Sequence, residues 1–114
     1  MEIQEFTEED WKLFRSKIVG WQEAYMDRLN KEYIELLSTD DNPAEKFWKL
    51  EERINQDKKK KGVILEKRRS RLIYNICNLI NEGAITMEDL EEFSDILKER
   101  VRTCLTVFQV SDED

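Results

Sequence analysis

The sequence predicts an all-α protein: an antiparallel helical bundle of three long helices in one domain, residues 1–114. Charged residues make up 39% of the chain and hydrophobic residues another 39%, with only 3 Gly and 1 Pro. This balance is typical of long amphipathic helices. Apolar residues also recur at spacings of three and four, which is the period of one helix face. A chain of 114 residues is long enough for a single modest core.

Two hexapeptides carry the same helix-start pattern, "FTEEDW" at 6–11 and "ITMEDL" at 85–90. In each, a threonine (Thr7, Thr86) can accept a hydrogen bond from the backbone N–H three residues later. An aspartate (Asp10, Asp89) stands at that position and can reach back to the threonine. Both hexapeptides therefore predict the first turn of a helix.

A third start lies in "STDDNPAEKFW", and one clear stop follows "LINE". Asn42 can cap a helix whose first position is Pro43, because the N–H that proline lacks would have no partner there. Gly83 offers the left-handed conformation that ends a helix. These signals predict helices at about 8–37, 43–82 and 87–108, followed by an acidic tail at 111–114.

The apolar positions of the three predicted helices form continuous faces, with one gap. The second helix has Phe47, Leu50 and Ile54, and then no regular apolar position until Leu65. The first helix presents Trp11, Phe14, Ile18, Trp21, Tyr25, Leu29, Tyr33 and Leu36, and the third Leu90, Phe93, Leu97, Val101, Cys104, Leu105 and Phe108.

Short connections make consecutive helices antiparallel neighbours. The third helix then lies along the C-terminal half of the second and the start of the first. Residues near 20–60 are left as a two-helix hairpin that projects from the base. In an alternative arrangement, the second helix breaks at Gly62 and the arm folds back into a compact four-helix bundle.

A projecting hairpin buries little by itself, yet this one is rich in apolar side chains, so we expect another surface to cover it. A second copy is the simplest cover and gives a homodimer with twofold symmetry. The predicted interaction residues are Trp21, Tyr25, Met26, Ile34 and Trp48. The leading prediction is a non-enzymatic helical interaction or regulatory accessory protein that self-associates or binds an unknown protein partner.

The segment "DKKKKGVILEKRRSR" at 57–71 places eight cations in fifteen residues. On an unbroken second helix, an outward stripe contains Lys49, Arg53, Lys60, Lys67 and Arg71. Three interpretations of this stripe are open. In one it binds nucleic acid in a nucleic-acid-associated regulator, and in another it is simply a solvated surface. In the remaining interpretation it pairs with an acidic strip on the third helix, which contains Glu88, Glu91, Glu92, Asp95 and Glu99. The net charge of -7 weighs against a dedicated DNA binder. A third function, ranked below these, is an inhibitor whose acidic strip imitates a phosphate backbone.

Several chemistries are excluded or not expected. The chain has no histidine, which excludes the Ser-His-Asp and Cys-His arrangements and histidine metal ligands. No glycine-rich phosphate loop is present. Cys77 is expected to point away from the apolar face and Cys104 to lie on it, too far apart for a disulfide. We therefore expect no enzyme, no catalytic residues, no cofactor and no metal.

No apolar run is long enough to cross a bilayer, and the acidic start "MEIQEFTEEDW" is unlike a secretory signal. The sequence therefore predicts a cytoplasmic protein without membrane contact.

The stretches "MEIQEFTEEDWKLFRSKIVGWQEAYMDRLNKEYIELL", "NPAEKFWKLEERI" and "LINEGAITMEDLEEFSDILKE" together resemble a family of small uncharacterised bacterial proteins. Some sequences of this family carry the label "multidrug transporter". That label conflicts with a chain that has no membrane-crossing segment. The resemblance implies a bacterial, cytoplasmic, helical accessory protein and transfers no functional residues.

Overall fold

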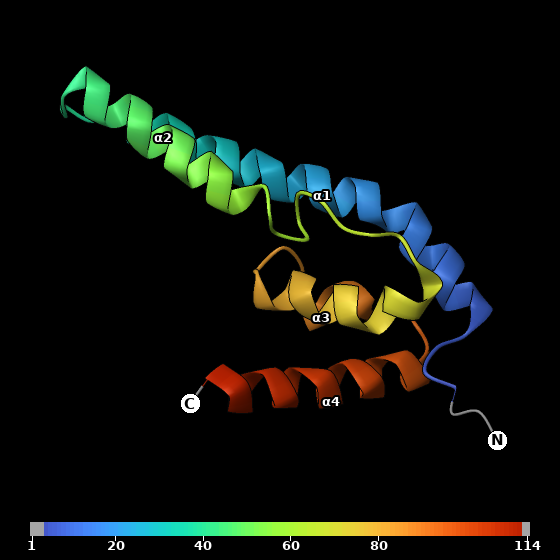
Figure 1. Ribbon diagram of the computed structural model, residues 1–114. Helices are drawn as coiled ribbons and strands as arrows, with labels where there is room; N and C mark the ends of the chain where they lie inside the picture. The colour runs from blue at the N-terminus through green and yellow to red at the C-terminus, as the bar shows by residue number, and fades with distance from the viewer. Residues whose placement is uncertain (1–3, 113–114) are drawn as a thin grey trace.

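The computed structural model describes residues 4–112, and side chains as far as 107. Its helices are α1 (Glu8–Leu37), α2 (Pro43–Asp57), α3 (Leu72–Asn81) and α4 (Asp95–Asp112), with short 3-10 helices η1 (Arg69–Arg71) and η2 (Met87–Leu90) (Figure 1). The described residues contain no strand, so the all-α prediction is confirmed. The predicted number of long helices is wrong, since four α-helices take the place of three. Of the predicted tail at 111–114, only the backbone of 111–112 lies within the described residues.

Helix α1 has the predicted bounds, and it begins where predicted because Thr7 and Asp10 form a reciprocal capping box. The Asp10 N–H donates to Thr7 Oγ1 at 3.1 Å, and the Thr7 N–H donates to Asp10 Oδ2 at 2.9 Å. Asp10 is buried and also accepts the Ser94 N–H at 2.8 Å. The cap of α1 therefore also holds the turn that precedes α4.

Helix α2 begins as predicted but ends far earlier than residue 82. Asn42 accepts the Ala44 N–H at 2.8 Å, and Pro43 occupies the first helical position. The helix ends at Asp57, within the gap between Ile54 and Leu65. A continuous helix would have put lysines on the side that faces α1, whereas the observed turn leaves Lys58 and Lys59 exposed.

The segment after α2 is held by bonds from distant parts of the chain. The Glu82 carboxylate accepts the Lys61 and Gly62 N–H groups at 3.0 and 3.1 Å. Gly62 is buried against Tyr25, and a Cβ there would lie 2.3 Å from Tyr25 Cδ2. The alternative arrangement is right about a break close to Gly62, since α2 ends at Asp57, but it is wrong about a compact bundle, because the arm does not fold back (Figure 1).

The predicted stop at Gly83 is confirmed, but the predicted start of the last helix at 87 is not. Gly83 has φ 78° and follows α3. "ITMEDL" forms only η2, in which the Thr86 N–H donates to Asp89 at 2.8 Å. Helix α4 begins at Asp95, where the Ser94 hydroxyl accepts the Leu97 N–H at 3.2 Å. The local signal correctly indicated a helical turn, but that turn ends at Leu90, and α4 begins separately after Ser94, which is bonded to Asp10.

The hydrophobic core lies in the base, where α3 and α4 run side by side beneath the first half of α1 (Figure 1). We use base for this part and arm for the α1–α2 hairpin from about 20 to 57. The arm gives the molecule its 61 × 35 × 22 Å extents. The core contains Trp11, Phe14, Ile18, Leu72, Ile76, Cys77, Leu79, Ile85, Leu90, Phe93, Leu97 and Val101.

Cys77 is a core residue, contrary to the prediction that it points away from the apolar face. Its side chain is fully buried, and its thiol donates to the Val101 carbonyl at 3.7 Å. Burial, together with a hydrogen bond to Cys104, raises the pKa of the Cys77 thiol. The prediction failed because α3 is covered on two sides, by α1 and by α4 (Figure 1), so the side that carries Cys77 is buried as well as the side that carries Leu72 and Ile76.

Candidate interaction surface

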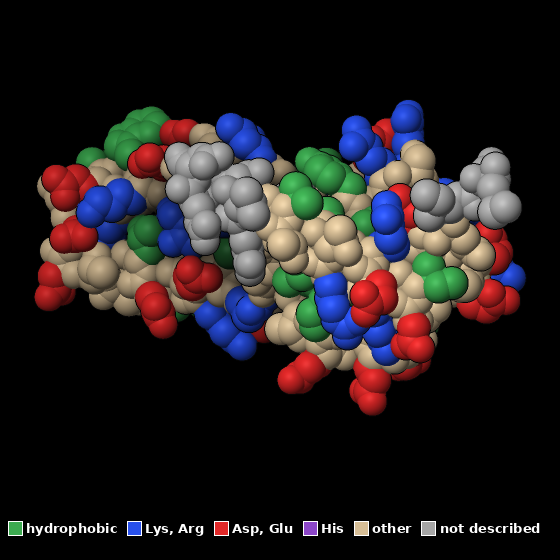
Figure 2. All heavy atoms as spheres, turned by 90° about the horizontal axis from the view of Figure 1, so that it is seen from below, with side chains coloured by type: hydrophobic (Ala, Val, Ile, Leu, Met, Phe, Trp, Pro, Cys, Tyr) green, Lys and Arg blue, Asp and Glu red, His purple; other side chains and the backbone are tan. Residues whose placement is uncertain are grey.

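The arm exposes an apolar surface along its length. Phe47 and Trp48 are each 62% exposed, and their rings meet edge to face with centroids 4.9 Å apart. Ile34 on α1 is 63% exposed and Ile54 on α2 is 41% exposed. Hydrophobic side chains gather on the arm toward its tip in the space-filling view (Figure 2).

Two hollows on this surface share Ile54. One, of about 270 Å³, lies between α1 and α2 and is lined by residues that include Met26, Asn30 and Val63. The other, of about 240 Å³, is lined by residues of α2 that include Phe47 and Leu50. We call the two hollows and the Ile54 ridge between them the arm groove.

The structure divides the five predicted interaction residues into two groups. Met26, Ile34 and Trp48 have exposed surface on the arm. Trp21 is half-buried at the edge of the core, with its ring 6.1 Å from that of Phe14. Tyr25 is buried against Gly62. The last two residues therefore join the arm to the base.

Phe47, Leu50 and Ile54 were predicted to form the apolar face of the second helix. Their spacing of three and four correctly indicated one face of α2. With only α1 beside it, α2 leaves much of that face uncovered. Val63 was missed because it belongs to a loop that the sequence analysis expected to be helix.

A buried carboxylate closes the inner end of the arm. Asp57 is 2% exposed and accepts the Tyr33 hydroxyl at 2.6 Å. Lys60 and Arg53 lie 3.3 and 3.5 Å from its oxygens. Burial alone would raise the pKa of Asp57, but bonds from Tyr33 and Lys60 and the charges of Lys60 and Arg53 together hold it below the usual value. Burial and the bond to Asp57 raise the pKa of Tyr33 to about 12.

The predicted basic stripe does not exist as one helix face, because α2 ends before Lys60. Three of its members contact acids: Lys49 lies 3.4 Å from Asp41, Arg53 lies 3.2 Å from Glu32, and Lys60 contacts Asp57. Arg71 lies over the Tyr74 ring, with Cζ 5.1 Å from the centroid. Lys67 is exposed in the loop between α2 and η1.

The predicted acidic strip is likewise spread over η2, the turn after it and α4. Glu92 pairs with Lys17 at 3.4 Å, and Glu99 pairs with Arg102 at 2.8 Å. Glu88 and Glu91 line a hollow of about 460 Å³ in the base, together with Met87, Lys98 and Arg102.

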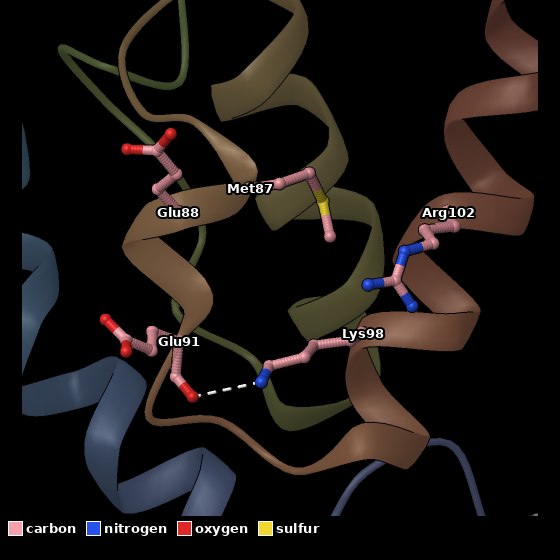
Figure 3. Close-up of a pocket in the computed structure, with 5 residues that line it drawn as sticks. All are labelled: Met87, Glu88, Glu91, Lys98 and Arg102. Atoms are coloured by element: carbon pink, nitrogen blue, oxygen red, sulfur yellow. Dashed lines mark hydrogen bonds between the residues drawn. The ribbon is translucent and has the colours of Figure 1, made fainter.

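Figure 3 shows Lys98 and Arg102 reaching from α4 toward η2, with the Lys98 ammonium donating to the Glu91 carbonyl at 3.0 Å. The carboxylates of Glu88 and Glu91 point away from these two cations (Figure 3). This open hollow has mixed charge and lacks the paired geometry of a catalytic acid and base.

Among the described side chains, no group of three or more Cys, Asp or Glu residues is placed to hold a metal ion. Of the helices in the described part of the chain, none has the length and apolarity needed to cross a membrane.

Comparisons of the chain with protein-family models, with curated proteins and with solved structures gave no match.

Proposed function

We propose that this chain is a non-enzymatic helical interaction protein that self-associates through its arm. The observation that carries the proposal is the arm groove, where Ile54 and Phe47 remain 41% and 62% exposed on a surface shared by two helices. Apolar surface that is continuous along an element is typical of an interaction site. The arm of a second copy carries the same apolar surface, and a twofold-symmetric dimer covers the surfaces of both arms.

The composition of the arm groove also resembles the centre of an interface. Aromatic and Met side chains are enriched at interface centres, and the arm offers Phe47, Trp48 and Met26. Phe47 and Trp48 adjoin at the outer end of the arm, while Met26 lies at its inner end. Contact along the whole arm would cover all three side chains.

The test is the mass of the protein in solution, measured by sedimentation velocity over a concentration series. We expect a dimer that the Trp48→Glu substitution converts to a folded monomer. Ile96→Glu is the matched control, because Ile96 is 43% exposed but belongs to α4 in the base. Circular dichroism establishes that each variant is folded. A dimer that persists unchanged in Trp48→Glu contradicts the placement of Trp48 at the interface.

A second candidate function is binding to nucleic acid, and the observation that favours it is the charge of the loop between α2 and α3. Among the described residues, Lys58, Lys59 and Lys67 have no acidic partner. Lys61 and Arg71 both lie over the Tyr74 ring, 5.8 and 5.1 Å from its centroid. Cations around an aromatic ring are typical of phosphate-tracking surfaces.

This second function is tested by fluorescence anisotropy of a labelled duplex and a labelled single strand across a salt series. Binding should weaken steeply with salt and be lost in the variant with both Lys67→Glu and Arg71→Glu. Arg69→Glu, which removes a cation already paired with Glu8, is the matched control. Absence of binding at low salt removes the loop as a nucleic-acid site.

A further inference from the structure

The charged side chains of the arm groove are arranged so that they complement a second copy of themselves. Glu51 lies on α2 three residues before Ile54, and Lys58, the C-cap residue that directly follows α2, lies four residues after Ile54 with helical backbone angles. Residues at these spacings share one side of a helix. Glu51 lines the outer hollow and Lys58 lines the inner one. The groove therefore has opposite charges on the two sides of its central ridge.

These two charges are also available for a partner. Lys58 is exposed and has no ion-pair partner among the described residues. Glu51 is exposed, and its carboxylate accepts a hydrogen bond from the uncharged Asn55 side-chain amide at 2.6 Å, with no cation paired to it among the described residues. Asp57, the third charged group of the groove, is buried and already bonded to Tyr33. Only Glu51 and Lys58 can therefore meet charges from outside.

We propose that two copies pair through antiparallel α2 helices about a twofold axis near Ile54, so that Glu51 of each copy meets Lys58 of the other. A twofold axis at this point exchanges the two sides of the ridge, and both contacts become attractive. A parallel pairing in register would instead bring Glu51 beside Glu51 and Lys58 beside Lys58. Charge thus selects the antiparallel arrangement.

The same axis matches the apolar shapes of the groove. Phe47 lies seven residues before Ile54, which is about 10 Å along the helix. The inner hollow of about 270 Å³, lined by Met26, Asn30 and Val63, lies on the other side of Ile54. Rotation about the axis places Phe47 of each copy over the inner hollow of the other. The exposed Phe47 ring of each copy then fills the inner hollow of the other copy.

This inference rests on the proposed self-association and specifies its geometry. The test uses two charge-reversed full-length chains, Glu51→Lys and Lys58→Glu. Each alone should dimerise on the order of tenfold to a hundredfold more weakly, because both twofold contacts become repulsive. In an equal mixture, every contact is attractive again, so a heterodimer should form. The single chain that carries both substitutions should recover the homodimer.

Sedimentation velocity gives the affinities, and native mass spectrometry identifies the heterodimer when one chain carries a mass label. Glu52→Lys and Lys59→Glu are the matched controls, because each is exposed and lies one residue farther along the chain. They should leave the dimer unchanged. Circular dichroism checks that all variants remain folded.

The possible results distinguish the antiparallel pairing of α2 helices from self-association in general. In one result, the wild-type protein dimerises and loses its dimer in Trp48→Glu, while the mixture of Glu51→Lys and Lys58→Glu forms no heterodimer. That result overturns the antiparallel pairing and leaves self-association standing. If the wild-type protein stays a monomer up to high concentration, both are overturned. Formation of the heterodimer in preference to either homodimer supports both.

Discussion

The base and the arm cover their apolar side chains to different degrees. In the base, side chains from α1, α3 and α4 meet in one core, where Phe14, Leu72 and Leu97 are fully buried. In the arm, only α1 and α2 face each other, and Ile34, Phe47 and Trp48 remain more than half exposed. The third layer makes the difference, since two helices alone cannot cover an apolar face that points away from their contact. The base therefore contains most of the buried apolar contacts, and the arm contains the exposed surface through which we propose that the protein self-associates.

The largest difference between the two parts is expected when one aromatic ring is removed from each. Phe14→Ala in the base should lower the free energy of unfolding by about 3–5 kcal/mol, because it leaves a cavity in a packed core. Phe47→Ala in the arm should change the stability of the monomer by no more than about 0.5 kcal/mol. Urea unfolding below the dimerisation concentration measures both values. Equal losses would contradict the division between base and arm.

The next largest effect is expected at the joint between the two parts. Gly62→Ala should cost about 1–3 kcal/mol, because its Cβ would overlap the buried Tyr25 ring. Gly20→Ala is the matched control. Gly20 lies inside α1, and no side chain or neighbouring segment comes within 4 Å of the position that a Cβ would take, so alanine should stabilise the helix by about 0.5–1 kcal/mol. Thermal unfolding of the two variants should therefore shift in opposite directions.

A smaller effect is expected from acid, and it involves both parts. Burial alone would raise the pKa of Asp10, but hydrogen bonds from Ser94 and Thr7 together hold it below the usual value, and the pKa of Asp57 is also lowered. A carboxyl whose pKa is lower in the folded state stabilises the fold above its unfolded pKa. This stabilisation is lost as pH falls below about 4. Urea midpoints measured from pH 6 to pH 2 should therefore decrease in the wild-type protein.

Asp10→Asn tests how much of the acid sensitivity comes from the base, and Asp57→Asn tests how much comes from the joint between base and arm. Each substitution should lower stability at pH 7 and reduce the slope of the midpoint against pH. Glu45→Gln, which changes an exposed carboxylate at the tip of the arm, is the control. A slope that remains unchanged in both Asp variants would exclude these two groups as its source.

The smallest effect is expected at Tyr33. Tyr33→Phe removes the hydroxyl bond to Asp57 and should cost about 0.5–1.5 kcal/mol near neutral pH. Because its pKa is raised to about 12 in the folded protein, the neutral phenol stabilises the fold below about pH 10, and this contribution is lost as pH rises toward 12. Urea midpoints between pH 9 and pH 12 should decrease less in Tyr33→Phe than in the wild-type protein. Identical alkaline profiles would contradict this role of the phenol.

Local sequence signals predicted much of the fold correctly. The Thr7–Asp10 cap, the Asn42–Pro43 start and the Gly83 stop all depend on atoms within a few residues of one another. Such interactions depend mainly on the residues of one short segment, although the matching pattern at 85–90 forms only the short helix η2. Amphipathic spacing likewise predicted the apolar faces that carry Phe14 and Leu97 into the core.

The candidate site was predicted only in part. Met26, Ile34 and Trp48 were placed on the surface of the arm correctly, while Trp21 and Tyr25 proved to belong to its junction with the base. Periodicity identifies a side of a helix but does not say what lies opposite. The partner of that side depends on where the neighbouring chain segment turns.

The helical class, the first helix and the helix starts at Thr7 and Asn42 could be predicted from the amino-acid sequence, because they follow from hydrogen bonds and periodicity within one segment. The end of α2 at Asp57 and the uncovered arm groove depend instead on contacts between distant parts of the chain. The turn depends on Glu82 binding the Lys61 and Gly62 N–H groups, and on Tyr33 binding Asp57. These partners are twenty or more residues apart, and no local pattern encodes a bond across that distance.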